Sequence, residues 1–582
     1  MRRTKIVCTI GPASDSVEIL KEMMLAGMNV ARLNFSHGTH EEHARRVENI
    51  RRAAQEVGKN IALMLDTKGP EIRTGPVREG QVMLEAGQRI VLTGREVPGD
   101  AREVSVTYPD LARQLRPGQR ILIADGVIEL KVEDTQDQDI ICRVVAGGPL
   151  GSHKNLHVPG VSLDLPALTE KDIADINFAI EHKFDFIAAS FVRRAADVLA
   201  IRRVLEERGV NIAIIAKIEN HEGVEKIDEI LKVASGIMVA RGDLGVDLPP
   251  EEVPLIQKKI IEKCNRAGKP VITATQMLES MINNPRPTRA EAADVANAIL
   301  DGTDAVMLSG ETAAGKYPVE AVKTMARIAA RAEEALTYLR TYPPEKDGSK
   351  TVTDAISHAG CTAAAELKAA AIITSTKSGY TARMVSKYRP RAPIVAVTPS
   401  MEVVRRLALV WGVQPLLVKE TSGTDEMIAA AIKVALSAGF IKAGDLVVIT
   451  AGVPVGVPGT TNLLKVHVVG DILARGQGIG SRAVTGRIRI ARTPKEAREK
   501  LQEGEILVTE ATDRDFMPVL ERAAAIITET GGLTSHAAIV GLELGIPVIV
   551  GVDGATSILP DGEIVTVDGA RGIIYRGVSR VL

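Results

Sequence analysis

Short apolar runs alternate with longer amphipathic segments along the first 340 residues. Most runs are followed by a segment such as SVEILKEMMLAG, in which apolar residues recur at helical spacing. Continuous apolar strands separated by helices indicate a parallel sheet, and a series of eight such units predicts a (β/α)8 barrel. The strands that we expect are 5–11, 28–35, 61–67, 184–192, 211–219, 236–244, 270–278 and 304–311.

The segment between the third and fourth of these strands departs from the pattern. Residues 71–168 alternate apolar and polar positions, as in QRILIADGVIELKV, and contain many Gly and Pro residues. This alternation predicts a small antiparallel β domain inserted after the third strand. Without it, residues 1–70 and 169–340 have the size of one (β/α)8 barrel, which is roughly 250 residues.

Two further regions follow the predicted barrel. Residues 341–470 begin with the Pro-containing, charged stretch TYPPEKDGSK and then repeat the alternation of strands and helices, which predicts a second α/β domain. Residues 471–582 carry strands of their own, such as EILVTE and AAIITE, separated by Gly-containing turns. We therefore expect an α/β protein of several domains.

Composition excludes several classes of function. Lys and Arg number 72 and Asp and Glu 73, and this balance argues against nucleic-acid or anionic-membrane binding. Aromatic residues make up 3%, which disfavours an RNA binder that stacks bases. The four cysteines form no CxxC pair, so we expect neither a zinc site nor disulfides. The start, MRRTKIVCTIGPAS, has no apolar signal region, and no apolar run is long enough to span a membrane, so we expect a cytoplasmic protein.

Polar residues gather where the predicted barrel strands end, and barrel active sites lie on that face. A charged residue in an apolar strand is costly unless it is paired or coordinates a ligand. One such residue alone is as readily explained by a strand-end cap or ion pair, but Lys, Glu and Asp converging from neighbouring strands favour a catalytic site. These strand-end residues are Arg32, Asn34, Ser36, Asp66, Thr67, Lys217, Glu219, Asp243, Thr275, Ser309 and Glu311.

Three of these residues indicate a particular chemistry. Glu219 and Asp243 are hard oxygen ligands on neighbouring strands, which suits Mg²⁺ or Mn²⁺. Lys217 precedes Glu219 by two residues, so both side chains point to the same side of the strand. A cation beside a carboxylate–metal pair could stabilise an enolate. The turn ARGDLG, which contains Gly242, exposes backbone N–H groups that can hold a carboxylate or a phosphate.

A second group of strand-end residues leaves two possibilities open. Asn34, Ser36, Asp66 and Thr67 have small oxygen-bearing side chains on adjacent strands, and they could hold a second, monovalent cation or form only a hydrogen-bond network. Arg73, at the entry to the inserted domain, could clamp a phosphate bidentately. A domain inserted on this face could swing over the site and exclude water, as phosphoryl transfer requires.

Six motifs, in the order ARLNFSHG, LDTKGPEIRTG, AKIENHEGV, MVARGDLG, ATQMLESM and MLSGETAAG, resemble those of the pyruvate kinase family over about 1–470. The resemblance implies a (β/α)8 barrel with an inserted β-barrel lid domain and a C-terminal α/β effector domain, assembled as a homotetramer. It also implies a glycolytic phosphotransferase that moves phosphate from phosphoenolpyruvate to ADP and gives pyruvate and ATP.

The resemblance also implies roles for cations and for the substrate-binding residues. Mg²⁺ (or Mn²⁺) would be held by Glu219 and Asp243, and Lys217 would stabilise charge on the migrating phosphoryl group and on the enolate. Arg32 would meet the substrate phosphate, and the Gly242–Asp243 turn the substrate carboxylate. K⁺ would lie among Asn34, Ser36, Asp66 and Thr67.

The remaining implied roles concern protonation and the nucleotide. Thr275 would lie beside the methylene carbon that is protonated. Arg73 and Lys154 match nucleotide-contacting positions, and Glu71 matches the position whose acidic form accompanies K⁺ dependence in this family. We therefore expect K⁺-dependent activity. Dispersed cations are needed because both substrates are polyanions.

Residues 374–381, TSTKSGYT, resemble the effector-phosphate loop of the family. Small hydroxyls, a Lys and a Gly after a strand suit phosphate binding, although a plain strand–helix turn is the alternative. The later loop AGVPVGVPGTTN lacks the Arg expected for a second phosphate, so we expect a monophosphate activator such as AMP or a pentose phosphate. The expected effector contacts are Thr374, Ser375, Thr376, Lys377, Ser378, Gly379 and Thr381.

The last segment has a different resemblance. TETGGLTSHAAIVGLELGIPVIVG resembles the swivelling phosphohistidine domain of phosphoenolpyruvate-utilising dikinases and phosphotransferases, with His536 at the position of the phosphorylated His. Gly541 and Leu542 stand where those enzymes usually carry Ala-Arg. We therefore favour a structural or regulatory role over phosphotransfer.

Two other functions stay open from the residues. One is another enolate-handling barrel enzyme, such as a metal-dependent aldolase or mutase, which would lack the inserted lid and Arg73. The other is a phosphocarrier or sensor that uses His536, which would require an inactive barrel site. Pyruvate formation that depends on ADP separates the first alternative from the kinase.

Overall fold

The computed structural model describes residues 2–336, 338, 340, 351–453, 461–470 and 472–579. The predicted linker TYPPEKDGSK, residues 341–350, lies outside the described residues. The chain divides into two compact units, one formed by Met1–Tyr342 with Ser400–Pro415 and the other by Pro343–Pro399 with Leu416–Leu582.

The first unit is built on a closed barrel of parallel strands. Among its described residues, eight strands pair in the order β1-β16-β15-β14-β13-β12-β3-β2. Each lies inside one of the expected apolar runs, so the prediction of a (β/α)8 barrel is confirmed. The strands are β1 (Lys5–Thr9), β2 (Val30–Asn34), β3 (Ala62–Asp66), β12 (Phe186–Ala189), β13 (Ala213–Ile218), β14 (Gly236–Ala240), β15 (Val271–Ala274) and β16 (Ala305–Leu308).

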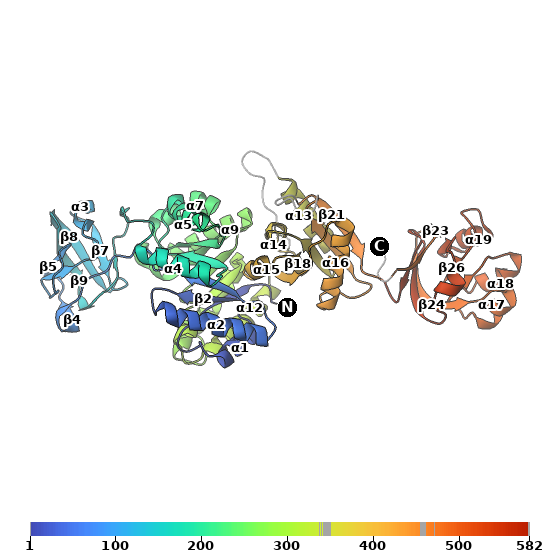
Figure 1. Cartoon of the computed structure of the whole chain (residues 1–582), viewed down its shortest axis with the longest axis horizontal. Helices are drawn as coiled ribbons and strands as arrows, with labels where there is room; N and C mark the ends of the chain where they lie inside the picture. Colours follow the sequence, from blue (N-terminus) through green and yellow to red (C-terminus); the bar gives the residue numbers. More distant parts are fainter. Residues whose placement is uncertain are drawn as a thin grey trace. The chain divides into compact units, whose positions relative to one another are not determined.

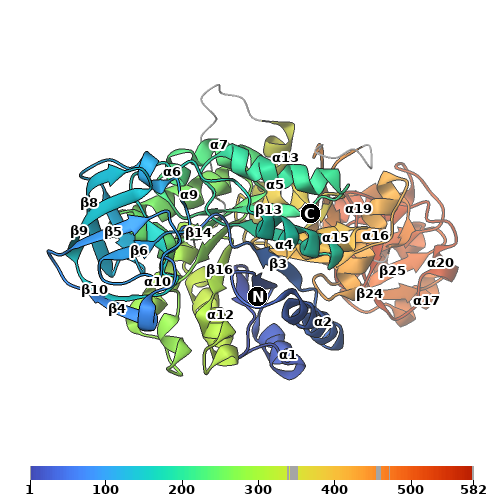
Figure 2. The same ribbon diagram turned by 60° about the vertical axis from the view of Figure 1, so that its left-hand side comes forward.

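The helices that follow these strands surround the barrel, and their ends are fixed by local sequence (Figure 2). Thr39, Thr169 and Thr288 each accept from the backbone N–H three residues on, in reciprocal capping boxes. The helices are α1 (Val17–Ala26), α2 (His40–Glu56), α4 (Glu170–Glu181), α5 (Ala195–Glu207), α6 (His221–Glu225), α7 (Ile227–Val233), α8 (Arg241–Asp247), α9 (Val253–Ala267), α10 (Arg289–Asp301), α11 (Gly310–Ala313) and α12 (Pro318–Glu334).

Alternation along the strands separates two layers of core. On β1, Ile6 and Cys8 pack with the surrounding helices, whereas Val7 packs with the residues that fill the barrel. Successive strand residues point to opposite faces, and both faces are covered here, which is why the strands have continuous apolar sequences.

The inserted segment between β3 and α4 forms the expected β domain, labelled at β4, β5 and β7 to β9 in Figure 1. Its sheets run in the orders β11-β7-β8-β9-β5-β6 and β10-β4. The pairs are antiparallel except for β5 with β6, which is parallel. The elements are β4 (Gln81–Leu84), β5 (Arg89–Thr93), β6 (Glu103–Ser105), α3 (Leu111–Gln114), β7 (Arg120–Ile123), β8 (Ile128–Gln136), β9 (Asp139–Ala146), β10 (Gly148–Gly151) and β11 (Leu156–His157).

Residues 400–415 lie within the predicted second α/β domain but belong to the compact unit of the barrel. This segment contains α15 (Met401–Leu407). Arg405 Nε lies 2.7 Å from the buried Asp185, which precedes β12, and Lys5 Nζ donates to the Val413 carbonyl at 2.7 Å. Ionisable residues at the N-terminal ends of barrel strands therefore anchor this segment.

The second unit begins with a sheet in the order β19-β18-β17-β20-β21. These strands lie where the alternation of strands and helices predicts a second α/β domain, and the first residues of β19 belong to the compact unit of the barrel. Its elements are α13 (Val352–Glu366), β17 (Ala371–Ser375), α14 (Tyr380–Ser386), β18 (Ile394–Thr398), β19 (Val413–Leu417), α16 (Thr424–Ser437), β20 (Leu446–Ala451) and β21 (Leu463–Val468).

The same unit continues into a second sheet, in the order β22-β29-β28-β24-β25-β26-β27-β23. Its strands are β22 (Ile472–Arg475), β23 (Gln477–Ile479), β24 (Ala483–Ile490), β25 (Ile506–Thr509), β26 (Ala525–Thr528), β27 (Val548–Val550), β28 (Ile564–Asp568) and β29 (Ile573–Arg576). Its helices are α17 (Pro494–Lys500), α18 (Met517–Leu520), α19 (His536–Leu544) and α20 (Ala555–Ile558). Across the described residues of the whole chain, no helix has the length and apolarity to cross a membrane.

Candidate active site

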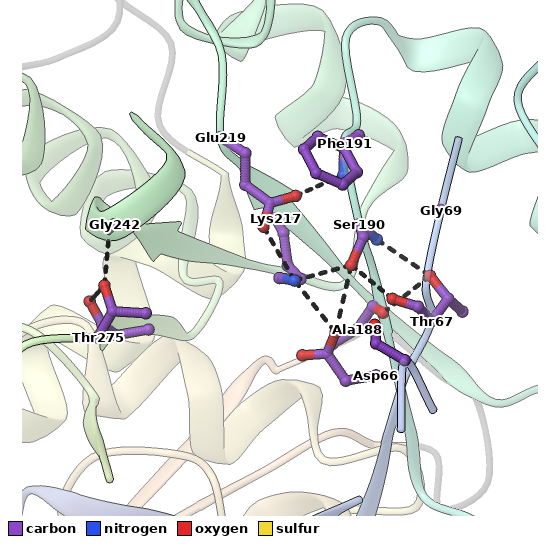
Figure 3. A network of polar contacts seen from close by, with 12 residues as sticks. Asp66, Thr67, Gly69, Ala188, Ser190, Phe191, Lys217, Glu219, Gly242 and Thr275 are labelled. Carbon is purple, nitrogen blue, oxygen red and sulfur yellow. Dashed lines mark hydrogen bonds and ion pairs between the residues drawn. The ribbon is translucent and has the colours of Figure 1, made fainter. Parts of the chain in front are cut away.

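Lys217 lies at the centre of the group of polar side chains in the barrel mouth (Figure 3). It is part of β13 and is buried. Its Nζ is 2.9 Å from Glu219 Oε1, 3.1 Å from Asp66 Oδ1 and 2.7 Å from Ser190 Oγ. Burial alone would lower the pKa of Lys217, but the carboxylates of Asp66 and Glu219 outweigh it and raise the pKa, so the side chain is an ammonium.

Glu219 follows β13 and is held from two sides. One carboxylate oxygen meets Lys217, and the other accepts the backbone N–H of Phe191 at 2.5 Å. Phe191 has a φ of 54°, a left-handed conformation that is unusual for a bulky residue. Burial raises the pKa of Glu219, and the charge of Asp243 raises it further, against the opposing effect of Lys217.

Asp243 and Gly242 lie in the first turn of α8, directly after β14, as the ARGDLG motif predicted. The N–H of Gly242 donates to Thr275 Oγ1 at 2.9 Å. Burial raises the pKa of Asp243. The strand order places β13, β14 and β15 side by side, so the ends of these strands bring Glu219, Asp243 and Thr275 to one mouth.

Thr275 has a strained backbone that other residues hold in place. Its φ is 64°, which a β-branched residue rarely adopts. Its carbonyl accepts from Arg241 Nη2 at 2.6 Å, and Arg241 is paired with Asp294 at 2.7 Å. Glu311 accepts the backbone N–H of Leu278 and that of Ser309. Glu311 therefore orders the loop that follows Thr275.

Arg32 is buried in β2 and is paired with Asp66 of β3. Its Nε lies 2.7 Å from Asp66 Oδ2, and its Nη1 lies 2.8 Å from Thr9 Oγ1. Burial would raise the pKa of Asp66, but the guanidinium of Arg32 and the ammonium of Lys217 outweigh it and hold the pKa below its usual range. Asp66 is thus a carboxylate between two cations.

Of the four residues expected to hold a monovalent cation, three are linked to one another, and the fourth, Thr67, is bonded to Ser190. Asn34 of β2 is in register with Asp66 of β3, and the Ser36 N–H donates to Asn34 Oδ1 at 3.1 Å. The Thr67 carbonyl accepts from Ser190 at 2.7 Å. The oxygens needed for a cation site and a local hydrogen-bond network are therefore both present.

The two nucleotide-site candidates lie where the chain enters and leaves the inserted domain. Arg73 donates through Nε to Glu71 at 2.8 Å and through Nη1 to the His153 carbonyl at 2.9 Å. The backbone of Lys154 pairs with Thr74, and the Lys154 side chain is exposed. Arg73 and Lys154 thus occupy adjoining segments.

A cleft of about 1320 Å³ opens at the mouth. Gly242, Asp243, Thr275, Ser309 and Glu311 are among its lining residues, together with Asp125 of the inserted domain. Arg32, Lys217 and Glu219 are not among them. The residues predicted from the sequence therefore fall into two groups. One group forms a buried charged cluster, and the other lines the open cleft.

The donor set fits a divalent cation. The cluster contains two cations, Arg32 and Lys217, and three acidic side chains, Asp66, Glu219 and Asp243, of which the last two have raised pKa values. Among the described residues, no group of three or more His, Cys, Asp or Glu side chains could hold a metal ion. Two carboxylates with substrate oxygens are a usual environment for Mg²⁺, so Glu219 and Asp243 could hold it only in part.

The residues of the predicted effector loop form the turn between β17 and α14. Gly379 caps α14 with a φ of 80°, and its N–H donates to Thr376 Oγ1 at 2.9 Å. Lys377 is exposed and pairs with Glu420 at 2.7 Å. The hydroxyl of Thr374 is buried and has no hydrogen-bond partner among the described residues. Of the loop AGVPVGVPGTTN, residues 454–460 lie outside the described residues.

His536 begins α19 in the last sheet domain, and its Nδ1 lies 3.0 Å from Thr512 Oγ1. The four cysteines lie apart from this residue. Cys8, Cys142, Cys264 and Cys361 are free and buried, and burial raises the pKa of each thiol. No cysteine belongs to the site.

The sequence argument missed the residues that end the first and fourth barrel strands. Thr9 contacts Arg32, and Ser190 contacts Lys217 and Asp66. The strand-end rule applied to the other strands would have found both. The contact of Arg241 with the Thr275 carbonyl had no comparable signal, because it depends on loop conformation.

The fold is a (β/α)8 barrel with an inserted β domain, and an ammonium and a guanidinium lie beside carboxylates at its mouth. These are features of a barrel enzyme that binds an anionic substrate. Family models match along most of the chain: pyruvate kinase, barrel domain over 1–322; pyruvate kinase, alpha/beta domain over 354–467; and PEP-utilising enzyme, mobile domain over 501–572.

Whole-chain relatives agree with these matches. A pyruvate kinase of Geobacillus stearothermophilus is 59% identical and one of Bacillus licheniformis is 58% identical, each aligned over 100% of both chains. A solved pyruvate kinase of Cryptosporidium parvum superposes with a TM-score of 0.75 at 42% identity, covering 80% of this chain and 96% of that one.

The chain belongs to the pyruvate kinase family. It is a phosphotransferase that acts on phosphoenolpyruvate and ADP. The aldolase or mutase and the phosphocarrier, which the residues alone left open, are thereby set aside.

Proposed function

We propose that the cluster around Lys217 is the phosphoryl-transfer site. The observation that carries this proposal is the position of Lys217 Nζ, within 3.1 Å of two carboxylates that come from different strands. In the reaction, the bond between phosphorus and the enol oxygen of phosphoenolpyruvate breaks, and a bond to a terminal oxygen of ADP forms. Lys217 stabilises the charge on the moving phosphoryl group and then on the enolate.

Arg32 binds the substrate phosphate. It lies on the other side of Asp66 from Lys217. Its guanidinium is preoriented, because Asp66 and Thr9 hold two of its nitrogens. The Gly242–Asp243 turn binds the substrate carboxylate. Gly242 N–H is held by Thr275 in this structure, so substrate binding would exchange that contact for a carboxylate oxygen.

Thr275 lies beside the methylene carbon of the enolate at the step in which that carbon is protonated. The enolate takes a proton at this carbon and becomes pyruvate. The Thr275 hydroxyl donates to the Ala274 carbonyl and accepts from Gly242. It also lines the open cleft, so a proton that it gives to the carbon can be replaced from solvent water.

Glu219 and Asp243 would hold Mg²⁺ (or Mn²⁺), and Asn34, Ser36, Asp66 and Thr67 would hold K⁺. The support is that Glu219 and Asp243 follow neighbouring strands of the barrel, and that burial raises the pKa of each, an effect that a bound cation would oppose. A bound divalent ion supplies charge neutralisation for the phosphate oxygens. Arg73 and Lys154 contact the nucleotide phosphates, and Glu71 holds Arg73 in place.

One experiment tests this assignment. ADP phosphorylation from phosphoenolpyruvate is measured with Mg²⁺ and K⁺ each varied, for the unchanged protein and for Lys217→Ala. We expect the variant to lose at least about 100-fold in kcat, and the unchanged protein to need both cations. Comparable turnover without K⁺ would refute the K⁺ assignment, and an active Lys217→Ala would refute the role of Lys217.

A phosphate monoester activator binds at 374–381. The support is the left-handed Gly379, the Thr and Ser hydroxyls, and the buried Thr374 hydroxyl, for which the described part of the chain offers no hydrogen-bond partner. AMP, ribose 5-phosphate and fructose 1,6-bisphosphate are titrated separately against activity at low phosphoenolpyruvate. We expect activation by a monophosphate, and a response to the bisphosphate alone would contradict it.

The domain at 471–582 has a structural or regulatory role. Gly541 and Leu542 replace the Ala-Arg of the phosphotransferring relatives. Incubation with phosphoenolpyruvate labelled in its phosphate should leave His536 unlabelled, and a stable adduct on His536 would overturn this proposal.

The protein acts in the cytoplasm as a homotetramer. The glycolytic reaction and the four free cysteines support the location, and the family supports the assembly. Sedimentation at working concentration tests the second statement, because a monomer or dimer would contradict it.

A further inference from the structure

Ser190 follows β12 directly and is 8% exposed. Its Oγ lies 2.7 Å from Lys217 Nζ, 2.7 Å from the Thr67 carbonyl and 3.2 Å from Asp66 Oδ1 (Figure 3). We propose that Ser190 is a positioning residue, which directs the Lys217 ammonium toward the phosphoryl group. This inference rests on the proposed role of Lys217.

The directions of these hydrogen bonds follow from the chemistry of the groups. An ammonium only donates, so Ser190 Oγ accepts from Lys217. The hydroxyl has one proton, and the Thr67 carbonyl at 2.7 Å is a closer acceptor than Asp66 at 3.2 Å. Ser190 is therefore fixed on both sides, with Lys217 as its donor and Thr67 as its acceptor.

Lys217 has three N–H donors and three partners within hydrogen-bond distance, namely Asp66, Glu219 and Ser190. The two carboxylates attract the ammonium without a strong preference for direction, and the four-carbon side chain is flexible. Without Ser190, the ammonium would shift toward the carboxylates. The neutral hydroxyl of Ser190 holds the ammonium between the two carboxylates and does not neutralise their charge.

The backbone around Ser190 is fixed by the same neighbours. The Ser190 N–H donates to Thr67 Oγ1 at 3.1 Å, and the next N–H, of Phe191, donates to Glu219 Oε2. A Cβ at Gly69 would lie 3.0 Å from the Ser190 Cβ, so Gly69 leaves the room that Ser190 needs. Two successive residues of one turn thus orient Lys217 and Glu219.

The test is Ser190→Ala, with Ser235→Ala as the matched control. Ser235 accepts the Ile214 N–H near the opposite end of β13, the strand that carries Lys217, so the control loses a serine hydroxyl hydrogen bond without touching the site. We expect Ser190→Ala to lower kcat about 10- to 100-fold. Its KM for phosphoenolpyruvate should stay within about twofold, because Arg32 and the Gly242–Asp243 turn are unchanged.

Ser190→Cys keeps the test available if the alanine variant fails to fold. It has nearly the same shape, but sulfur is a weak acceptor, so kcat should fall with KM retained. Kinetics like those of Ser235→Ala would overturn the proposal. A rise in KM with a loss of thermal stability would also overturn it, because that pattern indicates a structural role. Lys217→Ala is assayed in parallel, and its retained activity would refute the role of Lys217 independently of Ser190.

Discussion

Arg32 Nε and Asp66 Oδ2 lie 2.7 Å apart on neighbouring barrel strands, and both residues are buried. The other oxygen of Asp66 meets Lys217 at 3.1 Å. One carboxylate therefore joins the arginine proposed for substrate phosphate to the lysine proposed for phosphoryl transfer. Without the negative charge of Asp66, the buried Arg32 and Lys217 would lose the carboxylate that balances both of them.

Asp66→Asn keeps the shape of the side chain and removes this charge. We expect the free energy of unfolding to fall by about 3 kcal/mol, because a buried ion pair loses one partner. Asp110→Asn is the control, since Asp110 pairs with Arg113 at the exposed surface of the inserted domain, and it should change stability by less than about 1 kcal/mol. Denaturant midpoints measure both, and equal midpoints for the two variants would contradict the prediction.

Lys5 gives a prediction of pH dependence. Burial lowers its pKa to about 7 from an ordinary value of 10.5, with Arg2 adding to the effect and Glu333 and Asp304 opposing it. Between these two values the unfolded chain binds a proton that the native protein does not, so this group makes stability rise with pH. In Lys5→Met that contribution is absent. The stability of the unchanged protein relative to the variant should therefore grow with pH, by up to about 1.4 kcal/mol per unit.

Scanning calorimetry of both proteins from neutral to alkaline pH measures this difference. Lys21→Met is the control, because Lys21 is exposed and its partner Glu56 raises its pKa. A raised pKa gives stabilisation that is complete below the ordinary value of 10.5 and is lost only above it. The control difference should stay constant over this range, and a constant difference for Lys5→Met would count against a neutral buried lysine.

Thr275 can be tested by separating its hydroxyl from its strained backbone. Thr275→Ser keeps the hydroxyl and removes the β-branch that makes a φ of 64° unfavourable, so activity should stay within about fivefold. Thr275→Ala removes the hydroxyl and should lose about 100-fold in the protonation step. Exchange of the pyruvate methyl protons with D₂O, followed by NMR, measures that step apart from phosphoryl transfer. Equal exchange in both variants would exclude the hydroxyl from proton delivery.

Deleting residues 471–582 should leave turnover within about twofold, since no barrel residue comes from that region. The deletion should still lower the melting temperature. Leu446 and Val468 form a buried cluster with Ile573 and Tyr575, so removing the last two exposes apolar surface. Tyr575→Ala in the full chain removes the Tyr575 side chain from this cluster while the rest of the domain stays present. A tenfold loss of turnover in the folded deletion variant would show that the domain contributes to catalysis.

The pattern of apolar residues is enough to specify the barrel. Continuous apolar runs such as 211–219 specify buried strands, because hydrophobic periodicity is a local property, and every expected barrel strand formed. The strand-end rule also identified Lys217, Glu219 and Asp66, since the polar ends of parallel strands meet at one edge.

Which of these side chains contact one another depends on how the strands are ordered in the folded barrel. Barrel closure places β13 beside β12 and β12 beside β3, and this neighbourhood brings Lys217 to Ser190 and Asp66. The left-handed backbones of Phe191 and Thr275 and the packing of 400–415 with the barrel have no local signal either. They depend on hydrogen bonds and ion pairs between residues far apart in the chain, and such contacts exist only once the chain has folded.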